Sequence, residues 1–225
     1  MSRSSLDYQV LATDYDGTLT DNGAVAPAVL DGLRRLKETG RTVVLVTGRE
    51  LGELLEICPD IDLFDRVVAE NGGVLYRPAT ADVVALADSP DMRFVDRLRR
   101  ERIEPLCVGR VIVATRVPHD REVVAAIDEL GLALDVSYNK GAVMVLPSGI
   151  NKASGLRRAL EDLDVPAAAT IGIGDAENDE PFVGVCGWSV AVANAVPSFR
   201  ERADMVTRAS AGEGVLELIQ AMIQR

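Results

Sequence analysis

The chain has 225 residues, with 35 Asp and Glu against 24 Lys and Arg, which gives a net charge of −11. This length accommodates one large domain, or a core with a small insert. An acidic chain repels nucleic-acid phosphates, so we expect no nucleic-acid partner. No apolar run approaches the roughly 20 residues that span a bilayer, and residues 1–5 lack the apolar segment of a secretory signal. We therefore expect no membrane partner.

The cysteines and the single histidine indicate the cellular compartment of the protein and exclude some kinds of catalytic site. Cys58, Cys107 and Cys186 are far apart and odd in number, which is typical of reduced thiols in a cytoplasmic protein. The single histidine, His119, argues against a His-rich zinc site or a Ser-His-Asp triad.

The first third of the chain alternates strands and helices. An apolar run at residues 10–13 predicts a buried parallel strand that delivers Asp14 and Asp16, and Gly17 then lets the chain turn away. The elements expected next are a helix from Pro27 to a cap at Gly40, a strand at 41–46 ending in Thr47, Gly48 and Arg49, a helix at 50–57, and strands at 67–69 and 74–76 around a hairpin turn at Asn71-Gly72.

The pattern of apolar and polar residues changes from about Arg77, where it predicts a helix, a strand, a second helix and a hairpin. We predict helices at 89–102 and 119–130, and strands at 108–115, 132–138 and 142–146. This unit interrupts an alternating β/α pattern. It therefore predicts an inserted α+β cap domain at residues 81–148, between the two parts of a core formed by residues 1–80 and 149–225.

The β/α alternation returns after the insert. Expected elements are helices at 151–163, 177–183, 197–203 and 214–223, and strands at 168–173, 188–192 and 205–206. The first and last thirds together predict an α/β fold with a doubly wound, mostly parallel sheet.

Four polar clusters follow strands or begin helices of that sheet: Asp14 with Asp16, Thr47, Lys152, and Asp175 with Asp179. Each has a plain structural interpretation alone: a solvated turn, a helix N-cap, a surface lysine, and an acidic first turn. Asp175 and Asp179 are expected on one face of a helix start. A dinucleotide site at Gly172 and Gly174 is disfavoured because the third glycine is missing.

Because the carboxyl ends of parallel strands meet at one edge of a sheet, these clusters are expected to surround a single point. A carboxylate-rich site without His or Cys selects hard cations such as Mg2+. Such a site, with Mg2+ and with a lysine and a hydroxyl that bind an anion, has the groups that phosphoryl transfer requires. An aspartate can act as the nucleophile.

The whole chain resembles the haloacid dehalogenase-like (HAD) superfamily of phosphotransferases, through the ordered motifs DYDGT (14–18), VTGR (46–49), SGINK (148–152) and GDAEND (174–179). The position of the insert and the Glu70–Gly73 segment resemble the Cof-like subfamily with a type-two α/β cap. Within it, chain length and cap size are most similar to the archaeal-type phosphoglycolate phosphatases.

The resemblance implies a role for each matched residue. Asp14 would be the nucleophile, and Asp16 the acid that protonates the leaving alcohol and later the base that activates water. The phosphate and substrate would be bound by Thr47, Gly48, Lys152 and Asn178. Mg2+ would be held by Asp14, the backbone carbonyl of Asp16, Asp175 and Asp179, with Asp179 and Asn178 binding directly or through a water.

The substrate is expected to be a small phosphorylated metabolite, and a compact cap would suit 2-phosphoglycolate. Arg110, Arg116 and Lys140 are the candidate cap cations for its carboxylate. The alternatives are a sugar-phosphate phosphatase or phosphomutase of the same superfamily, and an inactive regulatory or structural subunit. A phospho-acceptor receiver module is disfavoured by the insert. Monomer and homodimer both remain open.

Overall fold

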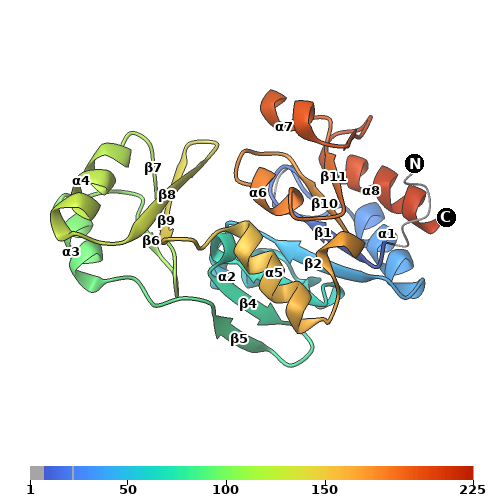
Figure 1. The fold of residues 1–225 in the computed structure, drawn as a ribbon, viewed down its shortest axis with the longest axis horizontal. Helices are drawn as coiled ribbons and strands as arrows, with labels where there is room; N and C mark the ends of the chain where they lie inside the picture. Colours follow the sequence, from blue (N-terminus) through green and yellow to red (C-terminus); the bar gives the residue numbers. More distant parts are fainter. Residues whose placement is uncertain (1–7, 22, 225) are drawn as a thin grey trace.

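The computed structural model describes residues 8–21 and 23–224, which form two β-sheets with separate helices (Figure 1). The large sheet has the strand order β12-β11-β10-β1-β2-β3-β4-β5. Its strands are β1 (Val10–Thr13), β2 (Thr42–Val46), β3 (Arg66–Ala69), β4 (Val74–Arg77), β5 (Asp82–Ala85), β10 (Thr170–Gly174), β11 (Trp188–Ala191) and β12 (Met205–Val206). The pairs from β12 to β3 are parallel, whereas β4 and β5 run antiparallel to their neighbours. This confirms the predicted doubly wound, mostly parallel α/β fold.

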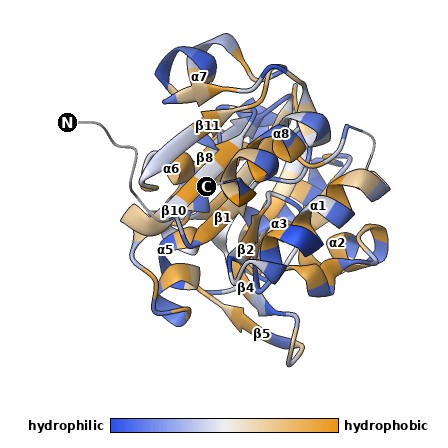
Figure 2. Ribbon diagram, turned by 90° about the vertical axis from the view of Figure 1, so that its right-hand side faces the viewer, coloured by the Kyte–Doolittle hydropathy of each residue, from blue (hydrophilic) through white to orange (hydrophobic). Residues whose placement is uncertain are grey.

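Helices cover both faces of the large sheet. They are α1 (Pro27–Glu38), α2 (Leu51–Ile57), α5 (Lys152–Asp162), α6 (Glu180–Val183), α7 (Pro197–Arg202) and α8 (Ala211–Ile223). Figure 2 shows strands β1, β2 and β10 between α5 and α6 on one side and α1 and α8 on the other. The central strands carry buried apolar residues on both faces, as strands between two helical layers must. No helix in the described part of the chain is both long and apolar enough to cross a bilayer.

The small sheet is antiparallel, with the order β6-β7-β9-β8. Its strands are β6 (Cys107–Val108), β7 (Val113–Arg116), β8 (Leu134–Asn139) and β9 (Ala142–Pro147), and its helices are α3 (Met92–Arg100) and α4 (Asp120–Leu130). Phe94, Val95 and Leu98 of α3 pack with Val113 and Val143 of the sheet in a hydrophobic core of their own. The small sheet with α3 and α4 is called the cap below.

Two expectations for the insert differ from the structure. The strand predicted at 108–115 is two strands, because residues 109–112 form a turn between β6 and β7. The strand β5 was not predicted, and it pairs with β4 in the large sheet. The expected boundary after residue 80 would separate these paired strands, so we propose that the insert begins between Ala85 and Met92.

Candidate active site

Four polar residues directly follow strands of the large sheet at the same edge. Asp14 follows β1, Thr47 follows β2, Glu70 follows β3 and Asp175 follows β10. The register of these parallel strands pairs Thr13 with both Leu45 and Ile173, so their carboxyl ends are level. The fold therefore brings together residues that are up to 161 positions apart in the chain.

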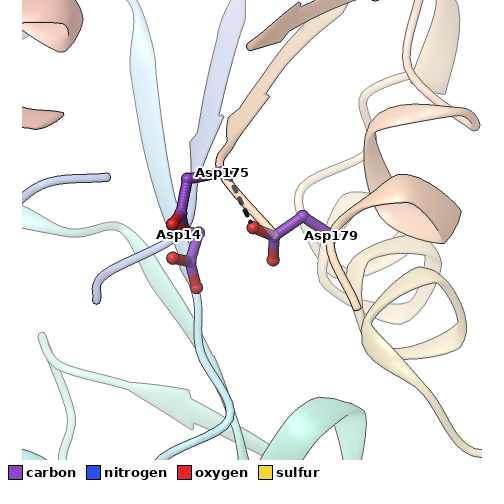
Figure 3. Close-up of side chains that lie close together, drawn as sticks. All are labelled: Asp14, Asp175 and Asp179. Atoms are coloured by element: carbon purple, nitrogen blue, oxygen red, sulfur yellow. Dashed lines mark hydrogen bonds between the residues drawn. The ribbon is translucent and has the colours of Figure 1, made fainter. Parts of the chain in front are cut away.

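Three of the predicted aspartates form a buried cluster. Asp14, Asp175 and Asp179 each offer a carboxylate oxygen, and these oxygens lie within 4.8 Å of one another. Figure 3 shows the three side chains converging from the end of β1 and from the segment after β10. Burial and repulsion from Asp179 raise the pKa of Asp14 to about 8, despite the opposing effect of Lys152. The cluster thus holds more negative charge than its surroundings neutralise.

Lys152 supplies part of the missing positive charge. It is the first residue of α5, a helix that Asn151 caps in a capping box with Ser154. Its ammonium lies 2.5 Å from Asp14 Oδ1 and 2.6 Å from Asp179 Oδ1, and only 1% of its side chain is exposed. Burial alone would lower the pKa of Lys152, but the two carboxylates outweigh it and raise the pKa above its ordinary value. Lys152 is therefore a buried cation, and the surface-lysine interpretation is wrong.

Asp179 reaches the cluster through a turn and not through a helix. The helix expected at 177–183 begins only at Glu180, so Asp175 and Asp179 do not share a helix face as predicted. Instead, Asp179 Oδ2 accepts the backbone N–H groups of Asp175 at 2.8 Å and Ala176 at 3.0 Å. Figure 3 shows the first of these hydrogen bonds, between Asp175 and Asp179. The two bonds fold the segment back on itself and fix the Asp179 carboxylate beside Lys152.

The Asp16 carboxylate is not part of this cluster. It forms a bidentate ion pair with Arg49, whose Nε and Nη2 donate to its two oxygens at 2.7 Å each. The Asp16 side chain is 42% exposed, whereas the other three carboxylates are buried. The guanidinium also lies 5.9 Å from the ring centroid of Tyr15. Arg49 belongs to the motif VTGR, but sequence reasoning gave it no role, because its partner is 33 residues away.

Of the residues expected to bind phosphate, Lys152 lies in the acid cluster, and Thr47, Gly48 and Asn178 lie near one another. Thr47 is buried, and its hydroxyl oxygen accepts the backbone N–H of Arg49 at 3.2 Å. The Nδ2 of Asn178 donates to Asn71 Oδ1 at 3.3 Å, while Asn178 Oδ1 is buried without a hydrogen-bond partner. A Cβ on Gly48 would lie 4.0 Å from that same Nδ2, so the three predicted residues are close neighbours.

Thr18 and Glu70 join the site without a role assigned from sequence, and Lys140, one of the three candidate cap cations, joins it as well. Thr18 donates to Asp175 Oδ1 at 3.1 Å, and Lys140 of the cap donates to Asp175 Oδ2. Glu70 is buried, and its carboxylate accepts the backbone N–H groups of Arg110, Val111 and Ile112 in the turn between β6 and β7. Thr18 could have been identified from its position in the motif DYDGT. Glu70 could not, because its partner lies 40 residues away and no local sequence pattern indicates the contact.

The donor set of the cluster fits a hard divalent cation. Among the described residues, the cations in contact with the three carboxylates are Lys152 and the half-exposed Lys140, and a buried amide oxygen of Asn178 lacks a hydrogen-bond partner. A buried unpaired oxygen is costly unless a cation, water or ligand contacts it. Oxygen ligands without sulfur or imidazole are those that Mg2+ prefers. Asp14, Asp175 and Asp179 are thus the residues that would hold such an ion.

Comparisons with known proteins cover most of the chain. Residues 11–92 and 109–219 match the family model of haloacid dehalogenase-like hydrolases. The chain is 33% identical over 220 residues to the phosphoglycolate phosphatase of Methanothermobacter thermautotrophicus, covering 94% of this chain and 97% of that one. It is also 33% identical over 223 residues to the phosphoglycolate phosphatase of Haloarcula marismortui, covering 95% and 96%.

Solved structures share the fold at lower sequence identity. A protein of Thermoplasma acidophilum is 20% identical, with a TM-score of 0.79 over 95% of this chain and 97% of that one. A haloacid dehalogenase-like hydrolase of Bacteroides thetaiotaomicron is also 20% identical, with a TM-score of 0.80 over 96% and 99%. The chain therefore belongs to the haloacid dehalogenase-like hydrolases and is an enzyme of their phosphatase class, as its full-length relatives are.

Proposed function

We propose that this chain is a Mg2+-dependent phosphomonoester hydrolase that acts on 2-phosphoglycolate through an aspartyl-phosphate intermediate. The observation that carries the proposal is the placement of Asp14. Its carboxylate lies among the oxygens of Asp175 and Asp179, beside the buried ammonium of Lys152. The names of the full-length relatives support the substrate.

In the first step, an oxygen of Asp14 attacks phosphorus, and the bond between phosphorus and the ester oxygen breaks. Asp16 gives a proton to the departing alkoxide. Its ionised form makes the bidentate pair with Arg49, and when Asp16 carries the proton, one of these two hydrogen bonds opens while the other keeps the carboxyl group oriented. Lys152 and the Thr47 hydroxyl bind phosphoryl oxygens. Mg2+ would supply further neutralisation of the negative charge at the transferring phosphoryl group.

In the second step, water attacks the phosphorus of the aspartyl-phosphate while the Asp16 carboxylate removes a proton from that water. The bond between phosphorus and the Asp14 oxygen breaks, which releases inorganic phosphate and restores Asp14. Asp16 retains the proton for the next turnover, so the cycle balances without another reactant. The two backbone N–H groups that donate to the Asp179 carboxylate hold this part of the site in place through both steps.

The test is release of inorganic phosphate from 2-phosphoglycolate and from hexose phosphates, with Mg2+ and with excess chelator. We expect turnover of 2-phosphoglycolate with the higher kcat/KM, and loss of that turnover when the chelator is added. A higher kcat/KM for hexose phosphates would overturn the proposed substrate. Undiminished turnover in chelator would overturn the proposed metal dependence. An isomerised product with a bisphosphorylated intermediate would identify a phosphomutase instead.

A further inference from the structure

Lys140 connects the cap to the buried acids of the core. It lies in the turn between β8 and β9, at the tip of a hairpin of the small sheet. Its ammonium donates to Asp175 Oδ2, across an ion pair in which Lys140 is 50% exposed and Asp175 is fully buried. In Figure 1 this hairpin extends from the cap toward the core near α6. A cation of the cap therefore lies at the reacting carboxylates.

The ammonium of Lys140 lies beside Gly17 of the DYDGT motif. A Cβ on Gly17 would lie 2.6 Å from Lys140 Nζ and 2.4 Å from Asp175 Oδ2. Gly17 directly follows Asp16, the residue proposed to protonate the leaving group. Lys140 is therefore placed to contact the organic part of a substrate and not only its phosphate.

The cap also approaches the core closely on the other side. A Cβ on Gly48 would lie 3.3 Å from Met144 Sδ of β9. Met144 pairs in register with Ala114 and Ser137, and the alternating residues Val143 and Val145 pack toward the helices of the cap. The face opposite those helices thus lies over the Thr47-Gly48 loop. Close contact at Gly48 favours a short leaving group.

The structure distinguishes the three cap cations, which the sequence presented as equal candidates for binding the substrate carboxylate. Arg110 and Arg116 are exposed, whereas Lys140 contacts a carboxylate of the core. Among the side chains of the described residues, Lys140 is also the cap cation with an ion pair to the acid cluster. The flexible four-carbon side chain of Lys140 allows its ammonium to exchange one anionic partner for another.

We propose that Lys140 is the specificity-determining residue that binds the carboxylate of a small phosphorylated acid. This inference rests on the proposed function and names the group that recognises its substrate. When Asp14, Asp175 and Asp179 hold a divalent cation, Asp175 no longer needs the ammonium as its counterion. The carboxylate of 2-phosphoglycolate then replaces Asp175 as the anionic partner of Lys140.

The first test compares two substrates that differ only in this charge. In 2-hydroxyethyl phosphate, a neutral hydroxymethyl group stands where 2-phosphoglycolate has its carboxylate. We expect Lys140→Met to lower the ratio of kcat/KM for 2-phosphoglycolate to that for 2-hydroxyethyl phosphate by about 10- to 100-fold, the range of a charge-assisted hydrogen bond. Lys140→Arg should keep most of the ratio, and Arg110→Met, which removes an exposed cap cation, should leave it unchanged.

The second test measures binding without turnover. The phosphonates 3-phosphonopropionate and propylphosphonate are non-hydrolysable isosteres that differ in the same carboxylate. With Mg2+ present, we expect calorimetry to show that wild type binds 3-phosphonopropionate more tightly, and that Lys140→Met removes this preference. The backbone of Lys140 is left-handed, with φ of 46°. Met and Lys are both unbranched at Cβ, so this strain is the same in the variant.

The outcomes distinguish this inference from the function on which it rests. Equal loss for both members of each pair would mean that Lys140 binds the phosphoryl group or serves the fold, and would overturn the inference. An unchanged ratio in Lys140→Met would also overturn it. A wild-type chain that hydrolyses neither phosphate would instead overturn the proposed function.

Discussion

Glu70→Gln is the substitution that most directly tests how the cap is attached to the core. Glu70 is fully buried at the end of β3, and its Oε2 accepts the N–H groups of Val111 at 2.8 Å and Ile112 at 3.1 Å. Its Oε1 accepts the N–H of Arg110 at 3.1 Å. Glutamine has nearly the same shape but only one accepting oxygen. Its best orientation keeps two of these hydrogen bonds, without the charge, and turns its NH2 group toward the third N–H.

The magnitude follows from these contacts. Two hydrogen bonds lose a charged acceptor and the part-buried N–H of Arg110 loses its partner, which together lower the free energy of unfolding by about 2–4 kcal/mol. There is no room for adjustment on one side, because a Cβ on Gly109 would lie 2.6 Å from Glu70 Oε2. We expect faster hydrogen exchange at the amides of residues 110–112 and a lower urea midpoint by circular dichroism.

The matched control is Glu50→Gln. Glu50 accepts a single backbone N–H, from Glu53 at 3.0 Å, at the N-terminus of α2. Its substitution should cost less than about 1 kcal/mol. The reasoning on Glu70 would be refuted by a loss below about 0.5 kcal/mol together with unchanged exchange at residues 110–112.

Two further substitutions test the nucleophile and an ion pair of the core. Asp14→Asn should lower kcat by at least about 1,000-fold with an unchanged circular dichroism spectrum, because an amide is not a competent nucleophile. The exposed Asp21→Asn in the same loop should keep its activity, and substantial turnover in Asp14→Asn would contradict the assignment. Asp162→Asn should lower the free energy of unfolding by about 1–3 kcal/mol at pH 7, measured by urea denaturation, with the exposed Asp96→Asn as control. Hydrogen bonds from Arg77 hold the pKa of Asp162 below its ordinary value, so this difference should be present above about pH 4 and shrink as the pH falls below it. A difference that grows on acidification would contradict the assignment.

Local patterns determined most of the fold. Apolar runs bounded by glycine and polar residues located the strands β1, β2 and β10, since a strand buried between two helical layers must be apolar on both faces. Parallel strands place their carboxyl ends at one edge, so the gathering of Asp14, Thr47 and Asp175 also followed from the sequence. The start of α5 at Lys152 was predictable because Asn151 caps it.

Where the prediction was wrong, contacts between distant segments decided the outcome. The turn after Asp175 is fixed by backbone N–H groups that donate hydrogen bonds to the Asp179 carboxylate, and this turn replaces the helix expected from residue spacing. Strand β5 was missed because it has only a short, half-buried apolar pair, Val83 and Val84, whose pairing with β4 is a tertiary event.

The sequence by itself thus determined the α/β core and the acids at its edge, because these depend on periodicity and on the direction of parallel strands. Only the tertiary structure decided which partner each charge has. Asp16 pairs with Arg49, Glu70 binds a turn of the cap, and Lys140 reaches Asp175 from another sheet. A charge obtains its partner from whatever the fold brings within about 3 Å, and separation along the chain carries no information about that distance.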